Sequence, residues 1–565
     1  MPDNNTFDAI VVGSGISGGW AAKELTEKGL KVLLLERGKN IEHIKDYKNT
    51  TKEIWDFPHR NGRTQQEIND YPHLKRDYPL RESMADDNWS PWASDKDNPY
   101  TEIKRYDWFR GYILGGRSLL WGRQSYRFNK WDFEANAKEG IGVDWPVRYD
   151  DIAPWYSYAE KFAGIQGTKE GLEVLPDGEF LPGMEMNVVE KDVAAKIKDH
   201  YKGKRHMFIG RSANITEPKP EQNRVNCQYR NRCWYGCPFG AYFSSNSATL
   251  PVAMKTGNLT IEADKIATQV LYDKDKKRAT GVEALDTNTN KTYTYNAKIV
   301  FLCASTFNST WILMNSATNI WPDGLGSSSG ELGHNVMDHH LKVGAGGVVE
   351  GYEDKYTFGR RPTGIYIPRF RNIYDDKRDY LRGFGYQGGA SRGRGVEIAE
   401  HTLGAELKEA LSEPGKWYMS IGGFGEILPD HSNKISLDKN KKDKWGLPVL
   451  AFDVELKENE LKMRKDMAND AAEMLEAAGV KDVKARDTGY AHGMGIHEMG
   501  TARMGRDPKT SVLNGFNQVW DAPNVFVTDG AFMASSSCVN PSLTYMAFTA
   551  RAADHAVSEL KKGNL

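Results

Sequence analysis

The sequence predicts an α/β fold in which a parallel sheet with its helices is interleaved with a second, α+β domain. Residues 7–38 have the pattern of a buried strand, a tight turn, a helix and a second buried strand. Far along the chain, residues 524–529 form another apolar strand, and a helix is expected from about Pro541. From residue 258 onward short strand patterns prevail. No internal repeat or low-complexity linker divides the chain, so the domains are expected to interleave rather than to follow one another.

A glycine-rich turn joins the first strand to the first helix. Its first glycine permits the turn, its second lets a pyrophosphate approach the backbone, and its third lets the helix pack on the strand. Glu36 ends the second strand, where it can accept hydrogen bonds from an adenosine ribose. This order of elements predicts a Rossmann-type dinucleotide site. The turn consists of Gly13, Ser14, Gly15, Ile16, Ser17 and Gly18.

The apolar strand at 524–529 indicates which dinucleotide is bound. It ends in Asp529 and Gly530, which suit a second contact with an extended cofactor. A cofactor held by both ends of the chain is expected to be a tightly bound flavin, FAD, rather than an exchanging nicotinamide.

Composition excludes several classes of protein. The 75 basic and 76 acidic residues give a net charge of −1, without the basic excess of a nucleic-acid binder. No run of eighteen apolar residues occurs, so the chain is expected to have no transmembrane segment of its own. The first residues lack a basic stretch and an apolar stretch, so no secretory leader is expected. Five cysteines in 565 residues cannot form a disulfide framework.

The domain boundaries follow from changes in pattern along the chain. The first domain is expected over residues 1–335, with a polar excursion at 40–110 and an irregular segment at 165–250. The second domain is expected over residues 336–485, where short strands mix with glycine-rich loops from 341 to 455. Residues 486–565 return to the first domain. Three local elements are also expected: a hairpin over 267–285, a strand over 296–304 and a helix over 456–479.

Three of the cysteines lie close together in the irregular segment. Cys227, Cys233 and Cys237 fall within eleven residues, among small and proline residues. Three thiolates on such a loop suit a soft metal or an iron–sulfur cluster, whereas zinc would require a fourth nearby ligand. A disulfide with one free thiol is the alternative, and the spacing alone leaves both open. Cys303 lies in an apolar strand and is expected to be an inert core residue.

Five motifs resemble, in order and spacing, those of the glucose–methanol–choline (GMC) oxidoreductases. They are the 13–18 turn, Gly115–Gly122, Gly333–His339, His497–Gly505, and Asp529-Gly530 with Asn540–Thr544. The resemblance implies the p-hydroxybenzoate-hydroxylase-like architecture, with residues 336–485 as the substrate domain. It implies cofactor contacts from Gly13, Ser14, Gly15, Ile16, Ser17, Gly18, Glu36, Arg37, Gly115, Gly116, Ser118, Trp121, Ala304, Asp529, Gly530, Asn540 and Pro541.

The resemblance also implies a catalytic pair, His497 and Asn540, facing the reactive edge of the flavin. Oxidation of an alcohol removes the hydroxyl proton as a hydride leaves for flavin N5, and an imidazole titrates in the right range to take that proton. An amide is no base, so His497 is assigned as the base and Asn540 as the group that orients the hydroxyl. Taken alone, His497 could be a satisfied core residue, and Asn540 before Pro541 could cap a helix.

One position departs from the branch of the family with covalently bound flavin. That branch has a histidine just before the tryptophan of the Gly-Gly segment, where this chain has Leu120 before Trp121. The FAD is therefore expected to be noncovalent.

A further branch of the family has the same cysteine spacing and binds a [3Fe-4S] cluster. By this resemblance Cys227, Cys233 and Cys237 are the metal ligands, and electrons leave through the cluster to a c-type cytochrome. That branch also implies a small partner subunit carrying a twin-arginine signal, and hence a periplasmic location by co-export. A cytoplasmic location is the alternative.

The resemblance implies a sugar or glycoside as substrate, most closely the C3 hydroxyl of a glucoside oxidised to the 3-keto sugar. The alternatives are a gluconate 2-dehydrogenase or glucose 1-dehydrogenase type, or less favourably a pyranose oxidase. From a different class, the chain could be a noncatalytic flavin subunit that relays electrons.

Overall fold

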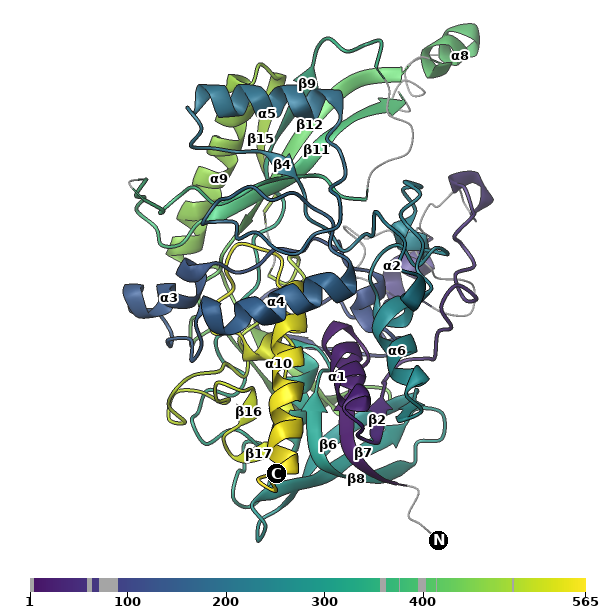
Figure 1. Cartoon of the computed structure of the whole chain (residues 1–565), viewed down its shortest axis with the longest axis vertical. Coiled ribbons are helices and arrows are strands. Elements are labelled where there is room, and N and C mark those ends of the chain that lie inside the picture. Colours follow the sequence, from purple (N-terminus) through teal and green to yellow (C-terminus); the bar gives the residue numbers. More distant parts are fainter. Residues whose placement is uncertain are drawn as a thin grey trace.

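The computed structural model describes residues 5–57, 64–70, 90–355, 362–374, 376–394, 403–412, 414–489 and 492–565. Two large sheets lie towards opposite ends of an elongated molecule, with helices α3 (Lys130–Glu139) and α4 (Tyr149–Ala163) between them (Figure 1). Within the excursion at 40–110, residues 58–63 and 71–89 lie outside the described residues.

The first sheet contains the parallel strands that the sequence predicts. Five strands run parallel in the order β17-β8-β1-β2-β5, and β16 is antiparallel at the β17 edge. A hairpin of β6 and β7 continues from β8. The apolar strand runs of the sequence are buried on both faces, as parallel strands require. The bounds are β1 Thr6–Val12, β2 Val32–Leu35, β5 Leu259–Glu262, β6 Lys265–Asp273, β7 Arg278–Asp286, β8 Thr292–Leu302, β16 Gln518–Val519 and β17 Ala522–Val527.

Helix α1 (Ile16–Glu27) packs between α10 (Ser542–Lys561) and α6 (Leu250–Lys255) beside this sheet. Ala21 and Ala22 of α1 share a core with Ala552 and Ala553 of α10. Small side chains at this contact let the two helix axes approach closely. Two further helices, α4 (Tyr149–Ala163) against α10 and α7 (Thr306–Asn315) against β6, complete this half (Figure 1).

The second sheet is antiparallel, in the order β15-β9-β12-β11-β10-β4. Helices α9 (Glu458–Ala477) and α5 (Val188–His200) share its apolar core. Gly423 on β12 permits this packing, because a Cβ there would lie 1.9 Å from Sδ of Met467 on α9. The strand bounds are β4 Phe208–Ile209, β9 Val343–Val349, β10 Ile365–Ile367, β11 Phe384–Arg394, β12 Pro414–Gly425 and β15 Lys481–Asp487.

The chain crosses between the two halves several times. The segment 165–250 supplies α5 and β4 to the second sheet. A small third sheet joins β13 and β14 to β3, and its apolar residues belong to the core of the first sheet. The domain boundaries at residues 335 and 485 are predictions from the sequence and remain predictions. The remaining bounds are α2 Gln65–Asp70, α3 Lys130–Glu139, α8 Gly404–Ser412, β3 Thr101–Glu102, β13 Lys434–Lys442 and β14 Pro448–Asp453.

The α/β fold predicted from the sequence is confirmed. The hairpin expected over 267–285 is β6 and β7, the strand over 296–304 lies largely within β8, and the helix over 456–479 is α9. The C-terminal strand and helix are β17 and α10, and β17 lies beside β8 in the same sheet as β1.

Candidate active site

A cavity of about 370 Å³ begins at the carboxyl ends of the parallel strands and reaches strands β11 and β12 of the second sheet. Ligands of α/β proteins bind at this end of the sheet. The cavity is lined by fourteen of the residues assigned to the cofactor: Gly13, Ser14, Gly15, Ile16, Ser17, Glu36, Arg37, Gly116, Ser118, Trp121, Ala304, Asp529, Gly530 and Asn540. Gly18, Gly115 and Pro541 are not part of its lining.

The three glycines of the first turn have three different environments. Gly13 has φ +92°, and a Cβ there would lie 2.5 Å from the carbonyl oxygen of Cys303 on the neighbouring strand end. Gly15 faces open space, with no atom within 4 Å of where its Cβ would lie. A Cβ at Gly18 would lie 1.7 Å from the carbonyl oxygen of Gly13, so this glycine lets α1 pack against the turn. The turn thus leaves room for a pyrophosphate at Gly15, at the positive end of α1.

Glu36 lies at the end of β2, buried at the wall of the cavity. Its carboxylate accepts hydrogen bonds from the amide and hydroxyl of Ser14 and from the amide of Gly38. Burial raises the pKa of Glu36 above its ordinary value, and the hydrogen bonds from Ser14 and Gly38 act in the opposite direction. Asp529 follows strand β17 of the same sheet, and burial raises the pKa of its carboxyl group to about 6.

The segment Gly115–Trp121 lies against the first turn. The amide of Gly115, at φ +93°, donates to the hydroxyl of Ser14 at 2.7 Å. Gly115 therefore contacts a residue of the cavity wall although it does not line the cavity itself. Trp121 lines the cavity, and its indole N–H donates to the carbonyl oxygen of Phe243 at 2.9 Å. Leu120 also lines the cavity and offers no nucleophile for a covalent flavin bond.

His497 and Asn540 line the same cavity, at the end nearer the second sheet. The backbone amide of His497 donates to Oδ1 of Asp338 at 2.9 Å, and its Nδ1 lies 2.8 Å from Nδ1 of His339. Burial, with His339 and Arg117 nearby, holds the pKa of His497 well below its ordinary value. The ring is therefore neutral at neutral pH and can accept a proton.

Asn540 is oriented by a residue of the second sheet. Nε2 of Gln387, on β11, donates a hydrogen bond to Oδ1 of Asn540. The interpretation of Asn540 as a helix cap is wrong, because α10 has Pro541 at its N-cap position and no side-chain cap. With its oxygen occupied by Gln387, the amide of Asn540 has its NH₂ group left to donate.

Sequence reasoning missed several residues around this pair. Gln387 on β11 and Phe424 on β12 reach the cavity from glycine-rich strands that carry no recognisable motif. Arg117 lies in the cavity wall and makes two hydrogen bonds, of 2.9 and 2.7 Å, to the carboxylate of Glu498. His339 belongs to a motif quoted above, but nothing in the sequence indicated its contact with His497.

The three clustered cysteines line a separate, smaller cavity of about 30 Å³. All three are free thiols, and burial raises the pKa of Cys227 to about 11. Arg224, buried nearby, donates its hydrogen bonds to neutral oxygens, and its charge interacts with Cys237. Within the described part of the chain, no three His, Cys, Asp or Glu side chains are grouped closely enough to hold a metal ion.

The parallel sheet, the glycine turn at a helix start and the half-buried imidazole in one cavity define a dinucleotide-dependent oxidoreductase of the α/β class. The chain belongs to the GMC oxidoreductase family: the N-terminal part of the family matches residues 7–341 and the C-terminal part matches residues 429–549. Members of this family bind FAD and act on CH–OH donors. The protein is accordingly an FAD-binding enzyme of this type.

Relatives of known activity cover nearly the whole chain. It is 29% identical to 2-methyl-1,2-propanediol dehydrogenase of Mycolicibacterium austroafricanum, over 97% of this chain and 94% of that protein. It is 26% identical to the fructose dehydrogenase large subunit of Gluconobacter japonicus, over 98% of each. In structure it resembles pyridoxine 4-oxidase from Mesorbium loti with a TM-score of 0.60 at 17% identity, over 97% of this chain and 98% of that one. No helix among the described residues is long and apolar enough to cross a membrane.

Proposed function

We propose that the protein is an FAD-dependent dehydrogenase that oxidises a secondary hydroxyl of a sugar or glycoside, with C3 of a glucoside as the preferred position. The observation that carries the proposal is the placement of His497 and Asn540 in one cavity with the glycine turn. A noncatalytic electron-relay subunit has no need of an uncharged imidazole and an oriented amide at this point.

The two side chains have complementary roles towards an alcohol. The NH₂ group of Asn540 donates to the hydroxyl oxygen and stabilises the negative charge that develops on it. The imidazole of His497 takes the hydroxyl proton as the C–H bond breaks and the C=O bond forms. The bound FAD supplies the acceptor for the hydride.

The substrate class is supported from two directions. The fructose dehydrogenase large subunit is named for a sugar substrate and matches this chain throughout its length. In the cavity, the ring of Phe424 lies 6.1 Å from that of His497, centroid to centroid, and gives the catalytic end an apolar wall for the C–H face of a sugar ring. The preference for C3 depends on the family resemblance described above.

The test is a dye-reduction screen over glucose, gluconate, sorbitol, trehalose and aryl-glucosides, with NMR of the product to locate the carbonyl. The expected result is reduction by a glucoside and a 3-keto product. The His497→Ala variant is expected to lose about 10²- to 10⁴-fold in rate. The control is His431→Ala, which removes an imidazole that is 60% exposed. Unchanged activity in His497→Ala would contradict the proposal, and rapid reoxidation by air with stoichiometric peroxide would indicate an oxidase.

A second candidate is a dehydrogenase of a short aliphatic diol. It is favoured by the 29% identity to 2-methyl-1,2-propanediol dehydrogenase over 97% of the chain. Including 1,2-diols in the same screen separates the two, because a diol dehydrogenase reduces the dye with the diols and not with the glycosides.

We propose further that Cys227, Cys233 and Cys237 hold a [3Fe-4S] cluster. The cavity that the three cysteines share supports this proposal, and the buried charge of Arg224, which interacts with Cys237, would offset part of the negative charge that cluster-bound thiolates bring. Such a cluster supplies one-electron transfer, here to a c-type cytochrome. Trp234, which follows Cys233 in the sequence, lines the large cavity, so the cysteine loop contributes residues to both cavities.

The cluster is tested by assays for iron and acid-labile sulfide and by EPR of the oxidised protein. About three irons per chain are expected in the wild type, with loss in Cys233→Ser. Cys538→Ala, which removes a buried thiol outside the cysteine loop, is expected to keep them. Zinc or no metal in the wild type would contradict the proposal.

Purification from the native host tests the proposed small subunit with its twin-arginine signal, and fractionation tests the periplasmic location.

A further inference from the structure

The ring of His497 is in hydrogen-bond contact with a second imidazole. The Nδ1 atoms of His497 and His339 are 2.8 Å apart, and the rings meet edge to face, with centroids 5.0 Å apart and planes at 83°. Two imidazole nitrogens at this distance must share one hydrogen, because two lone pairs would repel each other. Which ring carries that hydrogen decides which nitrogen of His497 is basic.

The other side of His339 settles the question. Its Nε2 lies 2.9 Å from the carbonyl oxygen of Ser537 and 3.2 Å from that of Ser536. Carbonyl oxygens only accept hydrogen bonds, so Nε2 of His339 carries a hydrogen. The ring is fully buried, and burial lowers the pKa of His339 to about 4. A neutral ring with its hydrogen on Nε2 has an acceptor at Nδ1.

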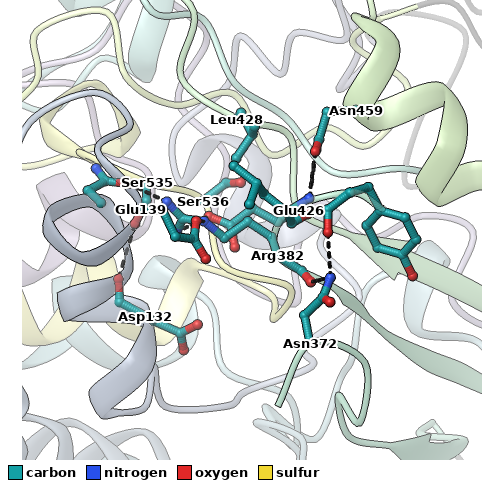
Figure 2. A network of polar contacts seen from close by, with 12 residues as sticks. Asp132, Glu139, Asn372, Arg382, Glu426, Leu428, Asn459, Ser535 and Ser536 are labelled. Atoms are coloured by element: carbon teal, nitrogen blue, oxygen red, sulfur yellow. Dashed lines mark hydrogen bonds and ion pairs between the residues drawn. The ribbon is translucent and has the colours of Figure 1, made fainter. Parts of the chain in front are cut away.

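The segment that carries these carbonyl groups makes polar contacts through the neighbouring residues Ser535 and Ser536 (Figure 2). The hydroxyl of Ser536 donates to the carbonyl oxygen of Ile427 at 3.1 Å, and that of Ser535 to the carbonyl oxygen of Asp132 at 3.3 Å. Arg382, with no exposed side-chain surface, joins the neighbouring segments through Glu139 and Glu426. These contacts hold the segment that carries the acceptors against Ile427 and Asp132.

We infer that His339 is a positioning residue: it accepts the Nδ1 hydrogen of His497 and so leaves Nε2 of His497 as the nitrogen that takes the hydroxyl proton. The inference rests on the proposed function for the role of Nε2, whereas the tautomer is a property of the protein alone. In the reaction the O–H proton moves to Nε2 of His497, and the hydride leaves the same substrate for the flavin. The Nδ1–H of the resulting imidazolium still donates to His339, which orients the base without adding a charge beside it.

Neutron diffraction of deuterium-exchanged crystals of the flavin-loaded protein tests the tautomer directly. Deuterium is expected on Nδ1 of His497 and on Nε2 of His339, with none on Nδ1 of His339. Deuterium on Nδ1 of His339 and on Nε2 of His497 would overturn the inference. The positions of the deuterium atoms do not depend on activity, so this experiment tests the tautomer alone. The proposed function would be overturned by a different result, namely the failure of every alcohol to reduce the flavin.

Variants at position 339 test the role in the reaction. His339→Leu removes the acceptor and is expected to slow flavin reduction about 100-fold in stopped-flow measurements, with flavin content and substrate KM little changed. His339→Asn restores an acceptor and is expected to recover most of the rate. The matched control is His340→Leu, which removes a buried imidazole that hydrogen-bonds Arg464 instead. Equal rates in His339→Asn and His339→Leu would overturn the positioning role, even if both variants are less stable.

Discussion

Nε2 of Gln387, near the start of β11, donates a hydrogen bond to Oδ1 of Asn540, the residue before the N-cap of α10. This contact joins the second sheet to the half of the molecule that holds the glycine turn, and it does so at the catalytic pair. It also fixes the polarity of the Asn540 amide, because an oxygen that accepts from Gln387 leaves the NH₂ group for the substrate.

The variants Gln387→Glu and Gln387→Leu are expected to differ in a direction that reveals this polarity. A carboxylate can only accept, so in Gln387→Glu the Asn540 amide turns its NH₂ group towards residue 387 and presents its oxygen to the alcohol. We expect flavin reduction to be at least about tenfold slower in Gln387→Glu than in Gln387→Leu. Stopped-flow reduction at saturating substrate measures this. A faster Glu variant would show that Asn540 does not act as a donor.

Alanine substitutions at two glycines of the first turn are expected to cause two different defects. Gly15→Ala adds a methyl group in open space at φ −64°, so the fold is expected to keep its stability while FAD binds more weakly. Gly18→Ala places a Cβ 1.7 Å from the carbonyl oxygen of Gly13 and is expected to cost about 1–3 kcal/mol of unfolding free energy. Thermal unfolding of the apoprotein and flavin titration separate the two effects. Equal stability losses in both variants would contradict this assignment.

The lowered pKa of His497 determines the acid side of the pH profile. Burial is the main cause, and the neighbouring His339 and Arg117 act in the same direction. A base works in its unprotonated form, and a lowered pKa keeps that form populated as the pH falls through the ordinary histidine value of about 6.5. We expect kcat/KM to stay level down to below about pH 6.5 and to decline only in more acidic buffer. Circular dichroism at each pH controls for unfolding, and a decline centred above about pH 6.5 would refute the prediction.

The flavin is expected to leave the protein on acid precipitation. Leu120, which lines the cavity, has no nucleophilic atom for a bond to the isoalloxazine ring. The yellow colour should therefore appear in the supernatant, and the mass of the denatured chain should equal that of the sequence. A pellet that stays yellow would show a covalent attachment elsewhere in the chain.

The parts of the site that depend on local backbone chemistry could be predicted from the sequence. The glycine turn, Glu36 and Asp529 follow from rules that act within a few residues, and all of these residues line one cavity except Gly18, which packs against the carbonyl oxygen of Gly13. Gln387 could not be predicted, because its role comes from the pairing of β11 with β12, and many glycine-rich strands have a similar pattern.

His339 marks a second limit of this kind. Its role depends on the carbonyl groups of Ser536 and Ser537, nearly two hundred residues away, whose direction is set by tertiary contacts. The motif containing Asp338 and His339 is visible in the sequence, but the hydrogen on each nitrogen is decided by neighbours that only the folded chain brings together.

The packing of α1 against α10 has a consequence for biosynthesis. The helix that begins at the glycine turn leaves the ribosome long before its partner in the core, at residues 542–561. Strand β17, beside β8, and Asn540 also arrive only at this stage. A nascent chain therefore has no complete flavin site until residues 522–561 have been synthesised, and a chain cut short before β17 would be left to proteases without the cofactor to stabilise it.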